Sequence, residues 1–231
     1  ASTAVNGAPR TSAGRLARLP RLSAVTRLGS PRAAIPVHPG SPLVVVNAAS
    51  DQHTSLVAGG SAGAHRALQH LAALGHRRVV YVGGPATAWS DRSRRAALRE
   101  AAGQLDITLV ELGEHQPHVD GGHSAADTVI ASGASAVITY NDLVAIGLLA
   151  RLRIRGVGVP DQLSVIGWDD TFIAALAAPA LTSIHVSPRE LGARAVELLD
   201  EALGGAEPRA VISDITLSVR ESSAPYTGGT Q

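Results

Sequence analysis

The segment RVVYVGGP (78–85) decides the fold class. Residues 78–82 are of β type and mostly apolar, without the alternation of a half-exposed strand, so they predict a strand buried on both faces. Two glycines and a proline end the strand, and a helical pattern over 90–102 follows, with Ser90 as its expected N-cap. Strand, turn and helix in this order form the repeating unit of a parallel sheet that carries helices on its faces.

The same unit recurs on both sides of this segment. Strands are predicted at 42–47, 107–112, 134–140, 163–168 and 181–186. Helices are predicted at 61–76, 123–131, 142–155 and 188–203. Residues 209–220 alternate loosely and predict a terminal strand or hairpin. The chain is therefore predicted to belong to the α/β class.

The composition excludes several classes of protein. The 231 residues are 45% hydrophobic and 17% charged, which is typical of a globular chain with a sizeable core. No apolar run reaches the roughly 18 residues that a membrane-spanning helix needs. The chain has no cysteine, so disulfides, thiolate zinc sites and a cysteine nucleophile are excluded.

The first 41 residues differ from the rest. Residues 1–50 contain six arginines and no acidic residue, so they carry +6 of the net charge of +1 and leave −5 for the remainder. Five prolines interrupt any long element before residue 42, so we predict irregular structure there. A basic segment of this kind is compatible with a nucleic-acid arm, an organellar targeting peptide or unstructured chain. No apolar stretch follows the early arginines as a secretory signal would require.

Aromatic and polar side chains gather where the predicted strands end. The aromatic residues there are Trp89, Tyr140, Trp168 and Phe172, and the polar ones are Arg94, Asn141, Asp142, Asp169 and Asp170. Ligands of open α/β sheets bind at the carboxyl ends of strands. Flat apolar faces beside bidentate polar groups suit a sugar or a nucleoside.

Each of these residues also has a structural interpretation. Asn141 and Asp142 are typical helix-start residues, and Asp169 and Asp170 are suited to cap a following helix. Arg94 belongs to an arginine-rich helix that is compatible with a solvated face. Trp168 is compatible with a place at the edge of the core. The gathering at strand ends, rather than any one residue, favours a ligand site.

The sequence offers little for catalysis. His115, His118 and His123 share one loop without the helical pairing of a metalloprotease motif, so no metal site is predicted. No serine lies in a GxSxG elbow, and GGSAG (59–63) lacks the lysine of a phosphate-binding loop. We therefore predict neither an enzyme nor a cofactor.

Four segments together resemble the lac repressor/galactose repressor (LacI/GalR) family of bacterial transcription regulators. They are HLAALGHRRVVYVGGP (70–85), ITYNDLVAIGLL (138–149), RGVGVPDQLSVIGWDD (155–170) and PALTSIHVSPRELGARAVELL (179–199). The resemblance covers about 42–222 and implies a periplasmic-binding-protein-like fold. That fold has two Rossmann-like parallel-sheet subdomains around a cleft, joined by three crossover strands. It also implies effector-binding roles for Arg94, Asn141 and Asp169.

The head of the chain resembles the family's DNA-binding headpiece. ASTAVNGAPRTSAGR (1–15) is similar to the end of its recognition helix, which would place Ser2, Thr3 and Asn6 near DNA. The preceding helix, and about a hundred residues of the N-terminal subdomain, have no counterpart. We thus expect an irregular headpiece remnant at 1–41, an incomplete N-terminal subdomain at 42–76 and about 187–222, and an effector-binding C-terminal subdomain at 77–186. We expect the N-terminal remnant to be loosely held or rearranged.

The resemblance implies a ligand-responsive repressor. Its expected partners are a sugar- or nucleoside-like effector, a second copy of the chain, and operator DNA bound by the full-length protein but not specifically by this chain. It implies a cytoplasmic protein with no membrane partner. Val186 and Pro188 replace polar or aromatic effector contacts of some members, so the effector's identity stays open. The alternative is a solute-binding protein of a sugar transporter on the same fold, against which the missing secretory signal and the repressor-type motifs count.

Overall fold

The computed structural model describes residues 42–228. The expectations for 1–41, including the DNA-binding roles of Ser2, Thr3 and Asn6, fall outside the described residues. The strands are β1 (Val44–Val46), β2 (Thr54–Ala58), β3 (Arg78–Val82), β4 (Thr108–Leu112), β5 (Ala136–Thr139), β6 (Ser164–Asp169), β7 (Thr182–His185), β8 (Ala210–Ser213) and β9 (Thr216–Ser218). The helices are α2 (Gly60–Ala73), α3 (Trp89–Gln104), α4 (Val119–Ala131), α5 (Asp142–Ile154), α6 (Phe172–Leu176) and α7 (Pro188–Leu203).

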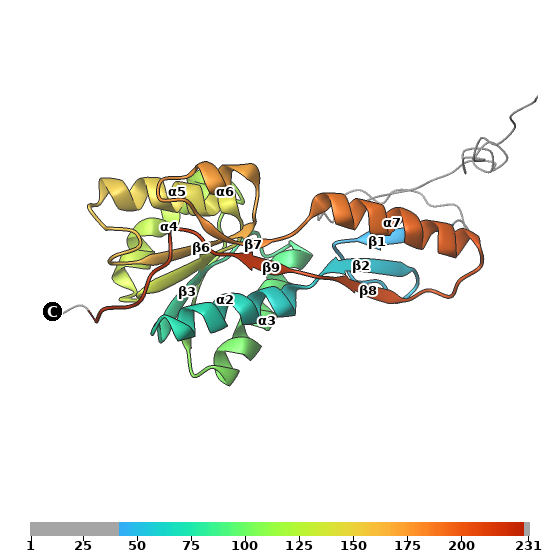
Figure 1. The fold of residues 1–231 in the computed structure, drawn as a ribbon, viewed down its shortest axis with the longest axis horizontal. Helices are drawn as coiled ribbons and strands as arrows, with labels where there is room; N and C mark the ends of the chain where they lie inside the picture. Colours follow the sequence, from blue (N-terminus) through green and yellow to red (C-terminus); the bar gives the residue numbers. More distant parts are fainter. Residues whose placement is uncertain (1–41, 229–231) are drawn as a thin grey trace, which may run out of the picture.

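The larger part of the molecule, here called the large lobe, is a three-layer α/β/α unit. Its sheet has the strand order β4-β3-β5-β6-β7-β9, parallel except for β9. Helices α2 and α3 cover one face and α4 and α5 the other (Figure 1). Since both faces are covered, the central strands β3 and β5 are mostly apolar, and residues 79–82 are fully buried, as RVVYV predicted.

Each face of this sheet has its own hydrophobic core. Leu68 and Leu98 lie in the core under α2 and α3, and Leu148 and Val165 lie in the core under α4 and α5. The helices of the second core approach closely. An added Cβ at Gly147 in α5 would lie only 1.9 Å from the carbonyl oxygen of Val119 in α4, so only glycine permits this packing.

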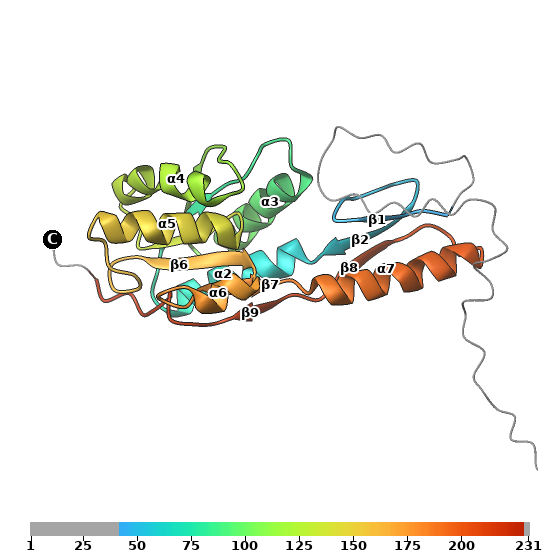
Figure 2. The same cartoon turned by 90° about the horizontal axis from the view of Figure 1, so that it is seen from above.

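The smaller part, here called the small lobe, is a parallel sheet of order β1-β2-β8 with α7 packed against β1 and β2 (Figures 1 and 2). Val44, Val46 and Leu56 face Leu191 and Leu198 of α7 in a separate core. A parallel sheet normally has both faces covered. Within residues 42–228, this lobe has three strands and one helix, so a helix covers only one face of its sheet.

Over its described residues, the chain passes between the two lobes three times, from β2 to α2, from β7 to α7 and from β8 to β9. These crossings lie together at the waist of the elongated molecule (Figure 2). The predicted fold class, two parallel-sheet units of the periplasmic-binding-protein type joined by three crossings, is confirmed.

Three expectations about elements are corrected. Residues 209–220 form no hairpin, because β8 pairs with β2 in the small lobe and β9 pairs with β7 in the large lobe. Helix α2, expected in the loosely held N-terminal remnant, packs against α3 and the large-lobe core instead. Helix α3 begins at Trp89 with Ala88 as its N-cap, so Ser90 is not the cap.

Candidate functional site

A cavity of about 360 Å³ lies between the lobes. From the large lobe it is lined by Trp89, Ser90, Ser93, Arg94, Tyr140, Trp168 and Asp169. From the small lobe and the crossings it is lined by Asn47, Val57, Ala58, Gly60, Val186 and Ile215. Most of these residues follow the carboxyl ends of parallel strands, where open α/β sheets bind ligands. Its volume lies within the roughly 300–1,000 Å³ of small-molecule sites.

Arg94 of α3 is the central polar group of this cavity. Its side chain is only 14% exposed, and its Nη2 lies 3.0 Å from Asp169 Oδ1. Its Nη1 donates to the Tyr140 carbonyl oxygen. The guanidinium carbon lies 4.4 Å from the Trp168 ring centroid and 4.8 Å from that of Tyr140. Two aromatic faces and an ion pair therefore hold the guanidinium in one orientation.

The start of α3, which carries Arg94, is fixed by the buried Asp91. Asp91 Oδ1 accepts hydrogen bonds from the Tyr81 hydroxyl at 2.9 Å and from the Gly84 amide at 2.8 Å. Its second oxygen accepts from Arg95 at 2.6 Å. Burial raises the pKa of Tyr81 far above its ordinary value, so the hydroxyl stays protonated and continues to donate.

Asp169 is held in a partly buried, strained position. Its φ of 99° lies in the left-handed region, which is unfavourable for residues other than glycine. Burial raises the pKa of Asp169, and the neighbouring Arg94 acts against that rise. The pair therefore brings hydrogen-bond donors and acceptors together at the cavity.

Tyr140 forms one wall of the cavity and is locked from two sides. Its hydroxyl lies 2.8 Å from Ser90 Oγ. Its ring lies against the backbone of Gly84, where an added Cβ would approach ring carbons to 2.6 Å. The glycine turn after β3 therefore serves the site, because any side chain at 84 would displace this ring.

A sequence profile of the family described as "Periplasmic binding protein-like domain" matches residues 68–223, more than half of the chain. The chain belongs to this family. Its relatives are of the LacI/GalR type, as the sequence motifs indicated. The transcriptional repressor PurR of Pasteurella multocida is 32% identical over 180 residues, which are 74% of this chain and 53% of that protein.

Two solved structures extend the comparison. The lac repressor dimer bound to operator and the anti-inducer ONPF is 25% identical, with a TM-score of 0.74, covering 80% of this chain and 66% of that chain. The CelR–cellobiose complex is 26% identical, with a TM-score of 0.71, covering 80% of this chain and 59% of that one. The chain spans about half the length of the curated relatives it matches, between 40 and 53% for three of them.

In this LacI/GalR-type domain, most of the predicted effector residues come together. Arg94, Asp169, Trp89, Tyr140 and Trp168 all line the cavity. Phe172 does not, because it begins α6 with its side chain 80% exposed, outside the cavity lining. Its prediction as a cavity residue is therefore wrong in this structure.

In the structure, Asn141 and Asp142 have the structural roles that the sequence offered as an alternative to ligand binding. Asn141 lies outside the cavity lining and caps α5, accepting from the Val144 amide at 2.9 Å and donating to the Pro117 carbonyl at 3.0 Å. Asp142 is buried and accepts from the Thr171 amide and the Ser183 hydroxyl, both at 2.6 Å. Burial raises the pKa of Asp142 despite these donors. Asn141 thus fixes the start of α5, and Asp142 fixes the loop after β6 through Thr171.

Sequence reasoning missed several lining residues. Asn47 ends the first predicted strand and has a φ of 60°, so the carboxyl-end rule applied to PLVVVN would have found it. Ser90 was assigned to capping instead of the cavity. Ile215 lies in a crossing, next to residues more than a hundred positions away, and no local pattern marks it.

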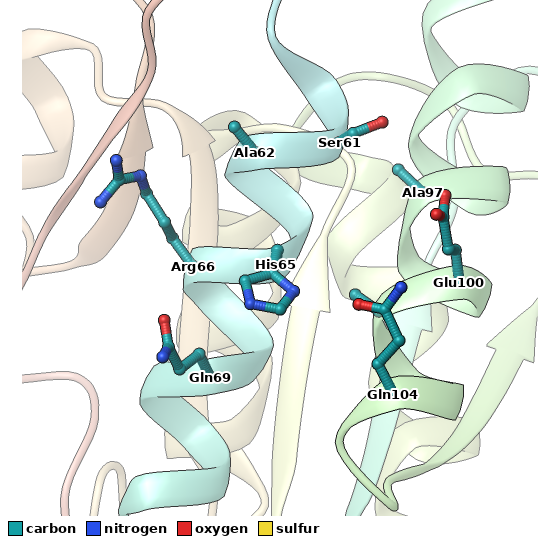
Figure 3. Close-up of a pocket in the computed structure, with 9 residues that line it drawn as sticks. Ser61, Ala62, His65, Arg66, Gln69, Ala97, Glu100 and Gln104 are labelled. Atoms are coloured by element: carbon teal, nitrogen blue, oxygen red, sulfur yellow. The ribbon is translucent and has the colours of Figure 1, made fainter.

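A second groove, of about 440 Å³, lies between α2 and α3 on the flank of the large lobe (Figure 3). His65, Glu100 and Gln104 line it around the small side chains of Ala62 and Ala97. It contains no tryptophan, tyrosine or phenylalanine and no ion pair, unlike the interlobe cavity. We therefore place the functional site between the lobes.

Within residues 42–228, no group of three or more histidine, aspartate or glutamate side chains is arranged to hold a metal ion. In the same part of the chain, no helix combines the length and the apolar character needed to cross a bilayer.

Proposed function

We propose that this chain is the effector-binding part of a ligand-responsive transcriptional repressor, and that it binds a sugar-like small molecule in the interlobe cavity. The observation that carries the proposal is the Arg94–Asp169 pair held between Tyr140 and Trp168. The regulators among the relatives support the same function. A repressor of this kind acts in the cytoplasm, where its operator lies.

The chemistry of the cavity favours a neutral, hydroxylated ligand. Arg94 presents planar donors and Asp169 presents acceptors, so together they match the paired hydroxyls of a sugar. The two charges offset each other, which disfavours a strongly anionic ligand such as a phosphate ester. The half-buried rings of Trp89 and Tyr140 supply apolar faces for a pyranose or furanose ring, while the buried Trp168 supports Arg94 from below. Cellobiose in CelR is a ligand of this class.

The mechanism is a shift between lobe arrangements rather than a reaction. An effector in the cavity contacts both lobes, so it favours the arrangement in which those contacts are best formed. It changes DNA affinity only by its differential affinity for the two arrangements. In the full-length protein, we propose that this motion repositions DNA-binding headpieces on an operator, as paired headpieces read palindromic half-sites.

We also propose that the chain forms a homodimer through the face that carries α6. Phe172 is 80% exposed and Leu176 is 76% exposed there, and neighbouring large apolar residues on a surface mark an interaction site. Replacing both with serine should convert a dimer to a monomer in sedimentation equilibrium. A control replaces the exposed Val196 of α7 with serine. A double variant that sediments like the wild-type dimer would exclude this face.

Isothermal calorimetry with D-ribose, D-xylulose, cellobiose and adenosine tests the ligand proposal. We expect one of the sugars to bind, and Arg94→Ala to weaken that binding by about 1.5–3 kcal/mol, as expected for lost hydrogen bonds to a charged group. The matched control is Arg99→Ala in the same helix, because Arg99 pairs with Glu111 outside the cavity. Unchanged affinity in Arg94→Ala would refute the site.

A further inference from the structure

The end of β6 contacts one element next to each of the three crossings between the lobes. Trp168 packs near Gly63 in the first turns of α2, where an added Cβ would lie 3.4 Å from the Trp168 ring. Asp169 is paired in the sheet with His185, the last residue of β7 before the crossing to α7. Asp170 reaches β9, which follows the third crossing. Three consecutive residues of the large lobe therefore contact the three elements that join it to the crossings, α2, β7 and β9.

Asp170 is the polar centre of these contacts, with a side chain only 8% exposed. Its Oδ2 accepts from the Ser218 hydroxyl at 2.7 Å and lies 3.0 Å from His185 Nδ1. Its Oδ1 lies 2.7 Å from Arg220 Nη1. The ion pair with Arg220 and the hydrogen bond from Ser218 hold the pKa of Asp170 below its ordinary value, although burial acts to raise it. A charged carboxylate thus binds β7 at its crossing end, through His185, and β9 at the opposite end, through Ser218 and the following Arg220.

Asp169 and Asp170 point their side chains to different partners. Asp169 meets Arg94 in the cavity, and Asp170 meets the crossing strands. Both residues have positive φ, 99° and 51°, so the intervening peptide is in a strained conformation that the surrounding contacts must hold. If the contacts of one aspartate change, the strained peptide can relax, and the other aspartate must then move with it.

We propose that Asp170 is a positioning residue that couples the cavity to the crossings: when Asp169 leaves Arg94, Asp170 moves β7 and β9 and so reorients the small lobe. The coupling rests on the proposed function, in which an effector competes for Arg94 and Asp169. In this proposal Asp169 contacts the ligand, and Asp170 transmits the resulting movement to β7 and β9. At the next residue of the same turn, the Thr171 amide donates to Asp142.

An interlobe distance measurement tests this coupling without an effector. The chain has no cysteine, so Glu100→Cys on α3 and Val196→Cys on α7, both exposed, place one spin label on each lobe. Labelled chain is diluted into unlabelled chain so that pulsed electron resonance reads distances within one protomer. Arg94→Ala then mimics the release of Asp169, with Arg99→Ala as its control.

We expect Arg94→Ala to shift the mean interlobe distance, and the same substitution in an Asp170→Asn background to lose most of that shift. The exposed Asp161→Asn background should keep it. An equal shift in the Asp170→Asn background, or no shift in Arg94→Ala alone, overturns the proposal. If circular dichroism shows that Asp170→Asn is unfolded, Ser218→Ala replaces it, and an undiminished shift there overturns the proposal as well.

The outcomes separate this inference from the proposed function. If calorimetry detects sugar binding but the distance shift in Arg94→Ala does not depend on Asp170, the role of Asp170 is rejected and the effector site stands. If the distance shift depends on Asp170 but no sugar in the panel binds, the sugar proposal is rejected and the role of Asp170 stands.

Discussion

At the scale of single residues, one residue of a neighbouring pair lines the cavity and the other supports the surrounding structure. Tyr140 lines the cavity, whereas Asn141 beside it caps α5 and Asp142 anchors the loop after β6. The same division holds at Asp169 and Asp170. Side chains that line a binding cavity need a fixed orientation. The adjacent residue helps to fix the backbone there without occupying the cavity.

Asn141 gives a direct test of this division. Asn141→Ala should lower the free energy of unfolding by about 0.5–2 kcal/mol, the usual cost of a lost N-cap. Asn141→Asp keeps an acceptor for the Val144 amide and should recover most of the loss. Urea denaturation of both variants measures it. Unchanged stability in Asn141→Ala together with weakened sugar binding would instead make Asn141 a ligand residue.

Among the elements, the C-terminal segment after β9 closes the end of the large lobe opposite the cavity. Ser222 donates to the Val165 carbonyl at 2.6 Å, and the Tyr226 amide donates to the Leu74 carbonyl at 2.7 Å. The buried His76 joins it, with Nε2 3.1 Å from the Ala224 carbonyl oxygen and Nδ1 2.8 Å from Ser135 Oγ. Burial lowers the pKa of His76, while the Ala224 carbonyl acts against that shift.

The lowered pKa of His76 predicts how the free energy of unfolding depends on pH. Because the pKa of His76 is lower in the folded chain than the 6.5 of the unfolded one, the folded state favours the neutral ring. Its stabilising effect is present above pH 6.5 and is lost as the pH falls below it. Thermal unfolding at pH 7.5 and 5.5 should show a drop that is smaller in His76→Gln. An equal drop in both proteins would contradict the prediction.

Element positions could be predicted from the sequence, but their partners could not. Hydrophobic periodicity gave α7 and the strand at 78–82 with their observed bounds. It could not say that α2 packs on the large lobe, because an amphipathic stripe does not identify the surface that covers it. Strands β8 and β9 are too short to show that they enter different sheets. In the site, the rule that ligands bind at the carboxyl ends of strands found the residues next to predicted strand ends. It missed Ile215, because this residue reaches the cavity only through the crossing between β8 and β9.

At the scale of the whole molecule, the central claim is that an effector binds between the lobes. Both walls and the three crossings converge on one cavity, so a bound sugar would contact both lobes at once. The chain offers an internal reporter for this event. Its two tryptophans are Trp89 and Trp168, and both line the cavity.

The most direct measurement is therefore a titration of intrinsic tryptophan fluorescence with the sugar that calorimetry identifies. We predict a saturable change in intensity or emission wavelength whose midpoint matches the calorimetric affinity and moves to higher concentration in Arg94→Ala but not in Arg99→Ala. A sugar that binds by calorimetry without any change in tryptophan emission would place the ligand outside this cavity and contradict the account.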